Sequence, residues 1–463
     1  MTTVAPDRTG SALPGTPLDR ASHGLDACVH CGFCLQACPT YVNLDDENDS
    51  PRGRLVLMRR MLDGAIAVDD RYAAMHIDRC LGCRACETAC PSGVPYGELL
   101  EATRATMIQV RGLPLTARII LAVFARKRLL RIMLGMARVL RNTGLPRIAA
   151  KLLPRRFAFP MAMLASTAPQ ELRAFVRRRN VNEQQTDNFP RSQRGKAAGH
   201  RPGNDNGDLS RTAAARASDE QLVATLDGCV MQGLFGHVNA ATMRCVERAG
   251  CRLVDAPLQG CCGALHAHAG DEETARALAR RNIEAFEQSG ADYIVSNSAG
   301  CGAMMKGYSH ILRDDPQWAK RAAQLSSRVR DASEFLADRL PVPQLPIPVR
   351  VTHDAPCHQM HAQRIVNQPL ALLGSIPELV LVPLEDADQC CGSAGIYNLI
   401  EPETSDAVLA PKLRNIRNTG AQLVATGNPG CMMQLGAGSM LDGEKELRVV
   451  HPLELVDAAY GDE

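Results

Sequence analysis

The chain has 463 residues, of which 45% are hydrophobic and 4% aromatic, a length that suggests about three globular domains. Its 18 cysteines fall into metal-ligand spacings and its N-terminus shows no export signal, which excludes a disulfide scaffold and predicts reduced thiolates in a cytosolic compartment. The net charge is +2, and no nucleic-acid partner is expected.

Residues 1–22 are rich in Pro, Thr and Gly, and we expect a flexible tail there. This segment lacks the apolar core of a signal peptide. The longest uncharged run, Thr419 to Leu441, is interrupted by five glycines and one proline. No stretch reaches 18 truly apolar residues, so no transmembrane helix is expected.

Residues 23–110 contain one cysteine pattern twice. The first copy is Cys28, Cys31, Cys34, Cys38 followed by Pro39, and the second is Cys80, Cys83, Cys86, Cys90 followed by Pro91. In bacterial-type ferredoxins this pattern binds two [4Fe–4S] clusters, and the fourth cysteine of each run ligates the other cluster. The pattern predicts a first thiol set (Cys28, Cys31, Cys34, Cys90) and a second thiol set (Cys80, Cys83, Cys86, Cys38). The alternative is a pair of structural zinc sites.

The 41 residues between Cys38 and Cys80 are too many for a minimal β-type ferredoxin loop. Within them, Pro51 is well placed to start a helix, and a helical-looking apolar run follows Arg54. We therefore predict an all-helical ferredoxin-like module whose helices carry and separate the two cysteine runs.

Residues 111–179 are apolar and basic together. Between Ala102 and Gln170 there are 13 Lys or Arg residues and no Asp or Glu. One interpretation is a helix packed on the cluster module with its basic side chains reaching solvent. The other is a surface that docks on an anionic membrane or an acidic partner subunit. Residues 180–219 have almost no large apolar side chains and are predicted to be a disordered linker.

The C-terminal half is an internal repeat, over residues 220–340 and 341–463. A third thiol set (Cys229, Cys261, Cys262, Cys301) recurs as a fourth thiol set (Cys357, Cys390, Cys391, Cys431). Strand-like runs end before these cysteines at 222–226, 293–296, 349–352 and 423–425, with helical runs at 271–288 and 402–419. Alternating strands and helices predict an α/β unit in each copy, with the thiols at the carboxyl ends of strands. The predicted fold is thus α+β multidomain.

Each repeat can bring four thiols together, and flanking glycines would permit tight turns around a cluster. We expect an additional iron–sulfur cluster in at least one repeat. The alternatives are buried reduced cysteines or a redox-active vicinal pair. Cys245 and Cys251 belong to neither pattern and are expected to pack as small apolar residues. His353, His358 and His361 are interpreted as loop histidines rather than ligands or proton donors.

Four runs of the sequence carry a resemblance to a known family: Cys28 to Tyr41, Pro51 to Arg54, Asp78 to Gly93, and Cys390 to Tyr397. They resemble the iron–sulfur subunit of glycolate oxidase. Both repeats resemble the cysteine-rich CCG domain of heterodisulfide reductase. The resemblance implies an electron-transfer subunit that works with FAD-binding subunits to oxidise glycolate, with contact to the quinone pool at a membrane. It implies no catalytic residue on this chain, and a cytoplasmic or peripheral inner-membrane location.

The chain departs from heterodisulfide reductase at the last position of each CxxC, where it has Met304 and Gln434. The sequence has no convincing flavin or nicotinamide motif either, so substrate oxidation is expected on the partner. Two alternatives stay open: a disulfide or heterodisulfide reductase that uses Cys261–Cys262 and Cys390–Cys391, and the iron–sulfur subunit of a D-lactate dehydrogenase.

Overall fold

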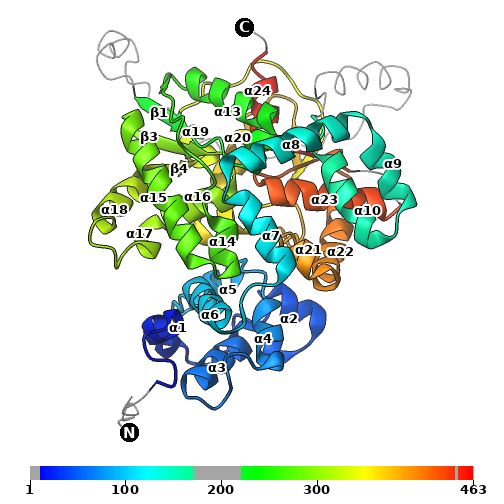
Figure 1. Ribbon diagram of the computed structural model, residues 1–463. Coiled ribbons are helices and arrows are strands. Elements are labelled where there is room, and N and C mark those ends of the chain that lie inside the picture. Colours follow the sequence, from blue (N-terminus) through cyan, green and yellow to red (C-terminus); the bar gives the residue numbers. More distant parts are fainter. Residues whose placement is uncertain (1–10, 170–171, 173–220, 444–446, 462–463) are drawn as a thin grey trace.

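The computed structural model of the chain describes residues 11–169, 172, 221–443 and 447–461. Figure 1 shows three regions: a helical N-terminal region, two α/β repeats side by side, and a group of helices that crosses the front of the repeats. The linker predicted over 180–219 lies outside the described residues.

The N-terminal region is helical, with no strand among residues 11–111. Its elements are α1 Pro17–Ala21, η1 Ser22–Ala27, α2 Pro39–Leu44, η2 Glu47–Asp49, α3 Pro51–Leu62, α4 Arg71–Asp78, α5 Ala85–Thr88 and α6 Tyr96–Arg111. Helices α2 to α4 separate the two cysteine runs, as predicted. The buried side chains of the N-terminal region form one core that includes Met58, Ile77 and Leu99.

The predicted flexible tail is wrong for its last part, because α1 is packed into the fold. Leu18 is fully buried, and its backbone N–H donates to Thr106 Oγ1 of α6 at 3.0 Å. The helix also begins with a capped turn, since the Thr16 side chain accepts the Asp19 N–H. A Pro- and Thr-rich composition hid this short helix, whose stability comes from tertiary packing.

The basic segment folds into α7 Leu115–Phe124, α8 Lys127–Asn142, α9 Leu145–Leu152 and α10 Arg155–Ser166. The interpretation that it packs on the cluster module is corrected. Helix α8 packs on α12 (Val230–Leu234) of the first repeat, and α10 packs on α23 (Pro429–Leu441) of the second. Both contacts use a glycine, since a Cβ at Gly233 would collide with Leu134 and one at Gly436 with Ser166.

Each repeat contains a four-stranded parallel sheet. The first has order β2-β1-β3-β4 and the second β6-β5-β7-β8. The strands are β1 Leu222–Thr225, β2 Arg252–Leu253, β3 Tyr293–Ser296, β4 Val329–Asp331, β5 Arg350–His353, β6 Val380–Val382, β7 Leu423–Ala425 and β8 Arg448–Val450. The central strands β1, β3, β5 and β7 are the four that the sequence predicts. Each is followed by a cysteine-bearing loop or helix, so the cysteines gather at one edge of each sheet.

The remaining elements of the repeats are helices. They are α13 Gly236–Arg248, α14 Ala264–Ala269, α15 Glu272–Ser289, α16 Ala299–Lys306, α17 Tyr308–Ile311, α18 Ala319–Arg328, α19 Ala332–Leu336, η3 His358–Ala362, α20 Asn367–Gly374, α21 Tyr397–Ile400, α22 Pro402–Asn418 and α24 Pro452–Ala458. Helices α15 and α22 match the predicted helical runs closely.

The two repeats share a core, so they form one body. Val223 and Val295 of the first sheet lie in the same buried apolar cluster as Val351 and Leu423 of the second. Arg244 of α13 also donates from its Nε and Nη2 to both carboxylate oxygens of Asp457 in α24. This packing fixes the relative positions of the third and fourth thiol sets.

Among the described residues, no single helix is long and apolar enough to cross a membrane. Helices α6 and α7 pass that test of length and composition as a pair, although the chain bends by 116° between them.

Candidate iron–sulfur sites

The structure brings the first thiol set together around one cavity. Cys28, Cys31, Cys34 and Cys90 all line it. The first three lie on the loop between η1 and α2, which turns through positive φ at His30 and Gly32. Cys90 comes from the end of the second cysteine run, 52 residues after Cys38. The fourth cysteine of the second run therefore lies at the same cavity as the first three cysteines of the first run.

The second thiol set surrounds a neighbouring cavity. Cys38, Cys80, Cys83 and Cys86 line it and are at most 8% exposed. Cys38 precedes α2, so it reaches this cavity from the first run. Cys86 lines both cavities, which places the two sites next to each other.

The chemistry of these donors fits iron–sulfur clusters. Burial raises the pKa of the Cys34 thiol to about 11, and Cys28 and Cys38 nearby add to the effect. Burial also raises the pKa of the Cys83 and Cys86 thiols well above the usual value. Because metals bind the thiolate, a bound cation is what would let several buried thiolates lie so close together. All 18 cysteines of the chain are free of disulfides.

A buried arginine lies beside the second thiol set. Arg54 is 0% exposed, and its Nε donates to the His76 carbonyl at 2.6 Å. Its Nη1 donates to Thr40 Oγ1 at 3.1 Å and approaches Cys38 Sγ at 3.9 Å. Its Nη2 donates to Asp49 Oδ1 at 3.1 Å. Burial alone would lower the pKa of Arg54, but the charges of Cys80 and its other neighbours hold this pKa above its usual value.

Two hydroxyl groups complete this environment. Thr40 Oγ1 lies 3.2 Å from Cys38 Sγ, and the Tyr96 hydroxyl donates to Cys80 Sγ at 3.6 Å. Hydrogen bonds and positive charge at cysteine sulfurs are the means by which proteins tune cluster potentials. The sequence did not identify Thr40 or Tyr96, and Arg54 entered only as the last residue of the Pro51 to Arg54 run.

The geometry of α3 explains why the sequence Pro51 to Arg54 suits this position. Pro51 occupies the first helical turn, and the Ser50 hydroxyl caps the Gly53 N–H at 2.9 Å. A Cβ at Gly53 would collide with the Glu47 carbonyl. The glycine therefore allows the close contact that carries Arg54 into the module.

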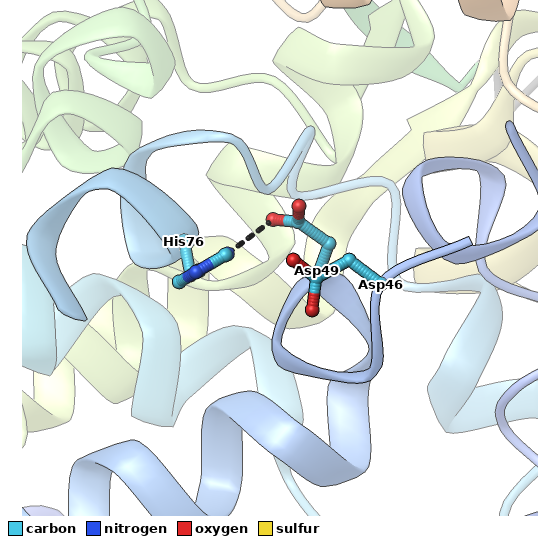
Figure 2. A group of neighbouring side chains, drawn as sticks. All are labelled: Asp46, Asp49 and His76. Atoms are coloured by element: carbon cyan, nitrogen blue, oxygen red, sulfur yellow. Dashed lines mark ion pairs between the residues drawn. The ribbon is translucent and has the colours of Figure 1, made fainter. Parts of the chain in front are cut away.

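Asp46, Asp49 and His76 lie close enough together to suggest a metal site, and Figure 2 shows their arrangement. We assign the group to an ion-pair network instead. Asp49 Oδ1 contacts both His76 Nδ1 and Arg54 Nη2 at 3.1 Å, and Asp49 Oδ2 accepts from Arg79 at 3.0 Å. Two guanidinium groups at one carboxylate already supply its positive charge.

The third thiol set forms a row of sulfur contacts. Hydrogen bonds link Cys229 to Cys261, Cys261 to Cys262, and Cys262 to Cys301. The hydrogen bond to Cys261 raises the pKa of Cys229, while the bonds from Cys229 and Cys262 hold the pKa of Cys261 well below its usual value. The row brings together all four cysteines that the sequence singled out.

The fourth thiol set repeats this arrangement. Hydrogen bonds link Cys357 to Cys390 and Cys390 to Cys391. Cys391 Sγ lies 3.2 Å from Cys431 Sγ. The hydrogen bond with Cys390, followed by burial, raises the pKa of Cys357. His358 Nδ1 also lies 3.5 Å from Cys357 Sγ.

Glycine is required behind each vicinal pair. Gly263 and Gly392 have φ values of +92° and +86°. A Cβ at Gly392 would lie 2.7 Å from the Ser405 carbonyl, and one at Gly263 would lie 3.3 Å from the Ala275 carbonyl. The turn that aims the two sulfurs into the site therefore excludes other side chains.

The positions that depart from the CxxC pattern have structural roles. Met304 packs in the first repeat's core together with Cys262. Gln434 is fully buried; its Nε2 donates to Ser405 Oγ at 2.8 Å and its Oε1 accepts from Asn398 at 2.7 Å. Neither side chain offers a thiolate.

The two cysteines outside the thiol sets are buried in the core, and two of the histidines near Cys357 have protein surroundings that account for them. Cys245 is fully buried in the core and Cys251 is 7% exposed. His361 has a partner at each ring nitrogen, with Nδ1 2.9 Å from Thr88 Oγ1 and Nε2 3.0 Å from the Asp388 carbonyl. Burial lowers the pKa of His353 to about 4, so this side chain is neutral.

The thiol sets adjoin one another across the regions of the fold. Cys83 of the second set and Cys390 of the fourth lie in one buried apolar cluster, and Cys357 packs against it. Asn428 then connects the repeats: its Nδ2 donates to Cys431 Sγ at 3.6 Å and its Oδ1 accepts the Gly300 N–H at 3.2 Å. The sets therefore follow one another in space as first, second, fourth and third.

Comparison with known proteins supports the iron–sulfur interpretation. Residues 24–94 match the family "4Fe-4S dicluster domain", and residues 223–306 and 351–436 match "Cysteine-rich domain". The chain is 35% identical to the "Probable glycolate oxidase iron-sulfur subunit" of Bacillus subtilis (strain 168), over 94% of each chain. The chain belongs to the glycolate oxidase iron–sulfur subunit family.

Other relatives extend this result. The "Glycolate oxidase iron-sulfur subunit" of Escherichia coli (strain K12) is 32% identical over 94% of each chain. "Lactate utilization protein A" of Exiguobacterium is 31% identical over 51% of this chain and 96% of that protein. Membership of the family and the dicluster match favour iron–sulfur clusters over zinc in the helical region, and with them a role in electron transfer.

Proposed function

We propose that this chain is the electron-transfer subunit of a flavin-dependent glycolate oxidase. FAD and the site of substrate oxidation belong to partner subunits, and the electrons continue towards a respiratory-chain acceptor. The observation that carries the proposal is the pairing of two complete four-cysteine sets around two adjoining cavities. Bound [4Fe–4S] clusters would supply one-electron redox chemistry at these cavities.

The contacts between thiol sets support this function. The first set includes Cys31, which is exposed, so this end of the series is accessible to a partner. The second and fourth sets share a buried apolar cluster, and Asn428 joins the fourth set to the third. We infer that the chain's own residues hold four sulfur sites in a continuous series between two surfaces of the protein.

Complementation with the flavin subunits tests the proposal. The full chain is reconstituted with iron and sulfide under anaerobic conditions and assayed with glycolate, alone and with the flavin subunits. We expect acceptor reduction only with both components, and a Cys34→Ser variant that slows it without weakening glycolate binding. Glycolate oxidation by the isolated chain, or full acceptor reduction without it, would refute the assignment.

A disulfide reductase is the second candidate. The vicinal pairs Cys261–Cys262 and Cys390–Cys391 favour it, because a neighbouring thiol can resolve a mixed disulfide. This activity predicts thiol–disulfide turnover by the isolated chain with a reduced electron donor, and its loss in Cys261→Ser. Turnover that appears only when a flavoprotein is added excludes this candidate.

A further inference from the structure

Helix α8 turns its apolar side away from the protein. Leu130 lines a cavity together with Gly228 and Cys229 of the first repeat and is 7% exposed. On the opposite side of the same helix, Ile132, Met136 and Val139 are 61%, 68% and 69% exposed. A helix at the surface of a soluble protein normally has the reverse orientation, with its apolar stripe towards the core.

The neighbouring helices continue this apolar surface. Leu145, Ile148 and Leu152 of α9 are 55%, 56% and 77% exposed. Helix α7 contributes Leu115 and Ile119, which are 69% and 58% exposed. Consecutive helices from α7 to α10 contact one another, and Figure 1 shows them together on the front of the two repeats. Soluble monomers rarely expose so many large apolar side chains in one region.

The charge of this segment is of one sign. Residues 115–166 contain 11 Lys or Arg residues and no Asp or Glu, while the rest of the chain has an excess of acidic residues. Arg118, Arg128 and Lys151 are exposed on α7, α8 and α9. Exposed apolar side chains flanked by basic ones are typical of helices that lie in the interface of an anionic bilayer. Protein–protein interfaces, by contrast, are depleted of charged residues at their centre. The charged residues that remain include both signs and face opposite charges on the partner.

We propose that the outer faces of α7, α8 and α9 form a docking face that seats the protein on an anionic lipid bilayer without crossing it. Its apolar members are Leu115, Ile119, Leu129, Ile132, Met133, Met136, Val139, Leu140, Leu145, Ile148 and Leu152. The helices lie flat on the lipid, and the basic side chains beside them contact the phosphate groups.

The docking face has a consequence for electron transfer. A cavity lies between α8 and the first repeat, and Lys127 and Arg131 line it together with Cys229 and Cys261. Docking therefore brings the third thiol set close to the lipid surface, where a lipid-soluble acceptor is available. This consequence rests on the proposed function, whereas the docking face itself does not.

Vesicle sedimentation tests the docking face. The full, cluster-loaded chain is mixed with vesicles of phosphatidylcholine alone or of phosphatidylcholine with about 40% phosphatidylglycerol, whose anionic headgroups produce a strong negative surface potential. We expect binding to the anionic vesicles, reduced more than tenfold in the triple variant Ile132→Gln/Met136→Gln/Val139→Gln. The charge variant Arg118→Glu/Arg128→Glu/Lys151→Glu should show the same loss, and high salt should weaken binding of the native protein.

The controls are matched in exposure and charge. Tyr72 and Val342 are 75% and 67% exposed elsewhere on the protein, so Tyr72→Gln/Val342→Gln should bind as the native chain does. Arg60 and Arg71 are exposed on the helical module, and Arg60→Glu/Arg71→Glu should lose much less binding.

A second measurement does not depend on the multiple variants. Tryptophan placed in the docking face by Met136→Trp should be quenched by brominated lipids, and tryptophan placed by Val342→Trp should not. Native protein that binds neither vesicle, or a triple variant that binds as well as the native chain, would overturn the proposal. If the variants instead lose only their flavin subunits, the face is a subunit interface and the lipid assignment is wrong.

Discussion

Arg54 is the residue whose environment is most unusual. A guanidinium without solvent contact is retained in the fold only because Asp49 and several hydrogen-bond acceptors surround it. Its Nη1 lies 3.9 Å from Cys38 Sγ. A fixed positive charge at this distance favours the more negative, reduced form of any cluster that the second thiol set holds.

Removal of this charge should affect both redox potential and stability. We expect Arg54→Gln to lower the reduction potential of one of the two clusters, while Arg54→Lys, which keeps the charge, stays closer to the native value. Arg54→Gln should also destabilise the helical module by about 3–5 kcal/mol, because Asp49 loses its buried partner. EPR-monitored redox titration and urea unfolding measure the two effects, with Arg60→Gln as an exposed control. An unchanged potential in Arg54→Gln would contradict the electrostatic role.

The glycines behind the vicinal cysteines make a second prediction at this scale. Gly392→Ala should cost about 1–3 kcal/mol from backbone strain alone, and more from the contact with the Ser405 carbonyl. We expect a lower unfolding midpoint and faster alkylation of Cys391. Gly374→Ala is the matched control, because no atom lies within 4 Å of its Cβ position. Equal stability of the two variants would show that the turn does not require glycine.

At the scale of elements, the sequence predicts the central strands but not the edge strands. β1, β3, β5 and β7 carry buried apolar residues and end before cysteines, so pattern and spacing agree. β2, β4, β6 and β8 have two or three residues each, and β2 and β6 have no buried residue. Segments this short have no periodicity to detect, and pairing with the neighbouring strand is what defines them. β7 is equally short, but all three of its residues are buried and it precedes Cys431, which is why the sequence predicts it.

The sequence also did not predict which sides of the basic helices contact the repeats. The sequence left two interpretations open, a helix packed on the cluster module and a docking surface, and most large apolar residues of α8 face outward. Contact with the repeats depends instead on small residues, such as Gly233 below Leu134. A pattern of hydrophobicity does not distinguish a side that faces protein from a side that faces lipid.

This packing gives a prediction for the element. Gly233→Ala places a Cβ against Leu134, so we expect α8 to loosen from the first repeat at a cost of about 1–3 kcal/mol. Trypsin should then cleave at Arg128 and Arg131 faster than in the native chain. Gly236→Ala has no atom within 4 Å of its Cβ and should be cleaved at the native rate. Native-like cleavage of Gly233→Ala would show that α8 is held by other contacts.

At the scale of the whole molecule, the sequence predicted which cysteines belong together but not how the groups are arranged. Spacing alone assigned Cys38 and Cys90 to opposite sets, and the cavities contain those combinations. The proximity of Cys83 to Cys357 joins residues of different regions, for which no local pattern exists. No local pattern identifies Asn428 either, because its contact with Gly300 forms only when the two repeats pack together.

The central claim is that the first and second thiol sets hold iron–sulfur clusters. Iron, sulfide and EPR analysis of the anaerobically reconstituted chain tests it most directly, in the native protein and in Cys34→Ser. The account predicts at least about eight iron atoms per chain, since two four-iron clusters are proposed, and loss of one reduced-cluster signal in the variant. Protein without iron, or a variant with an unchanged EPR spectrum, would contradict it.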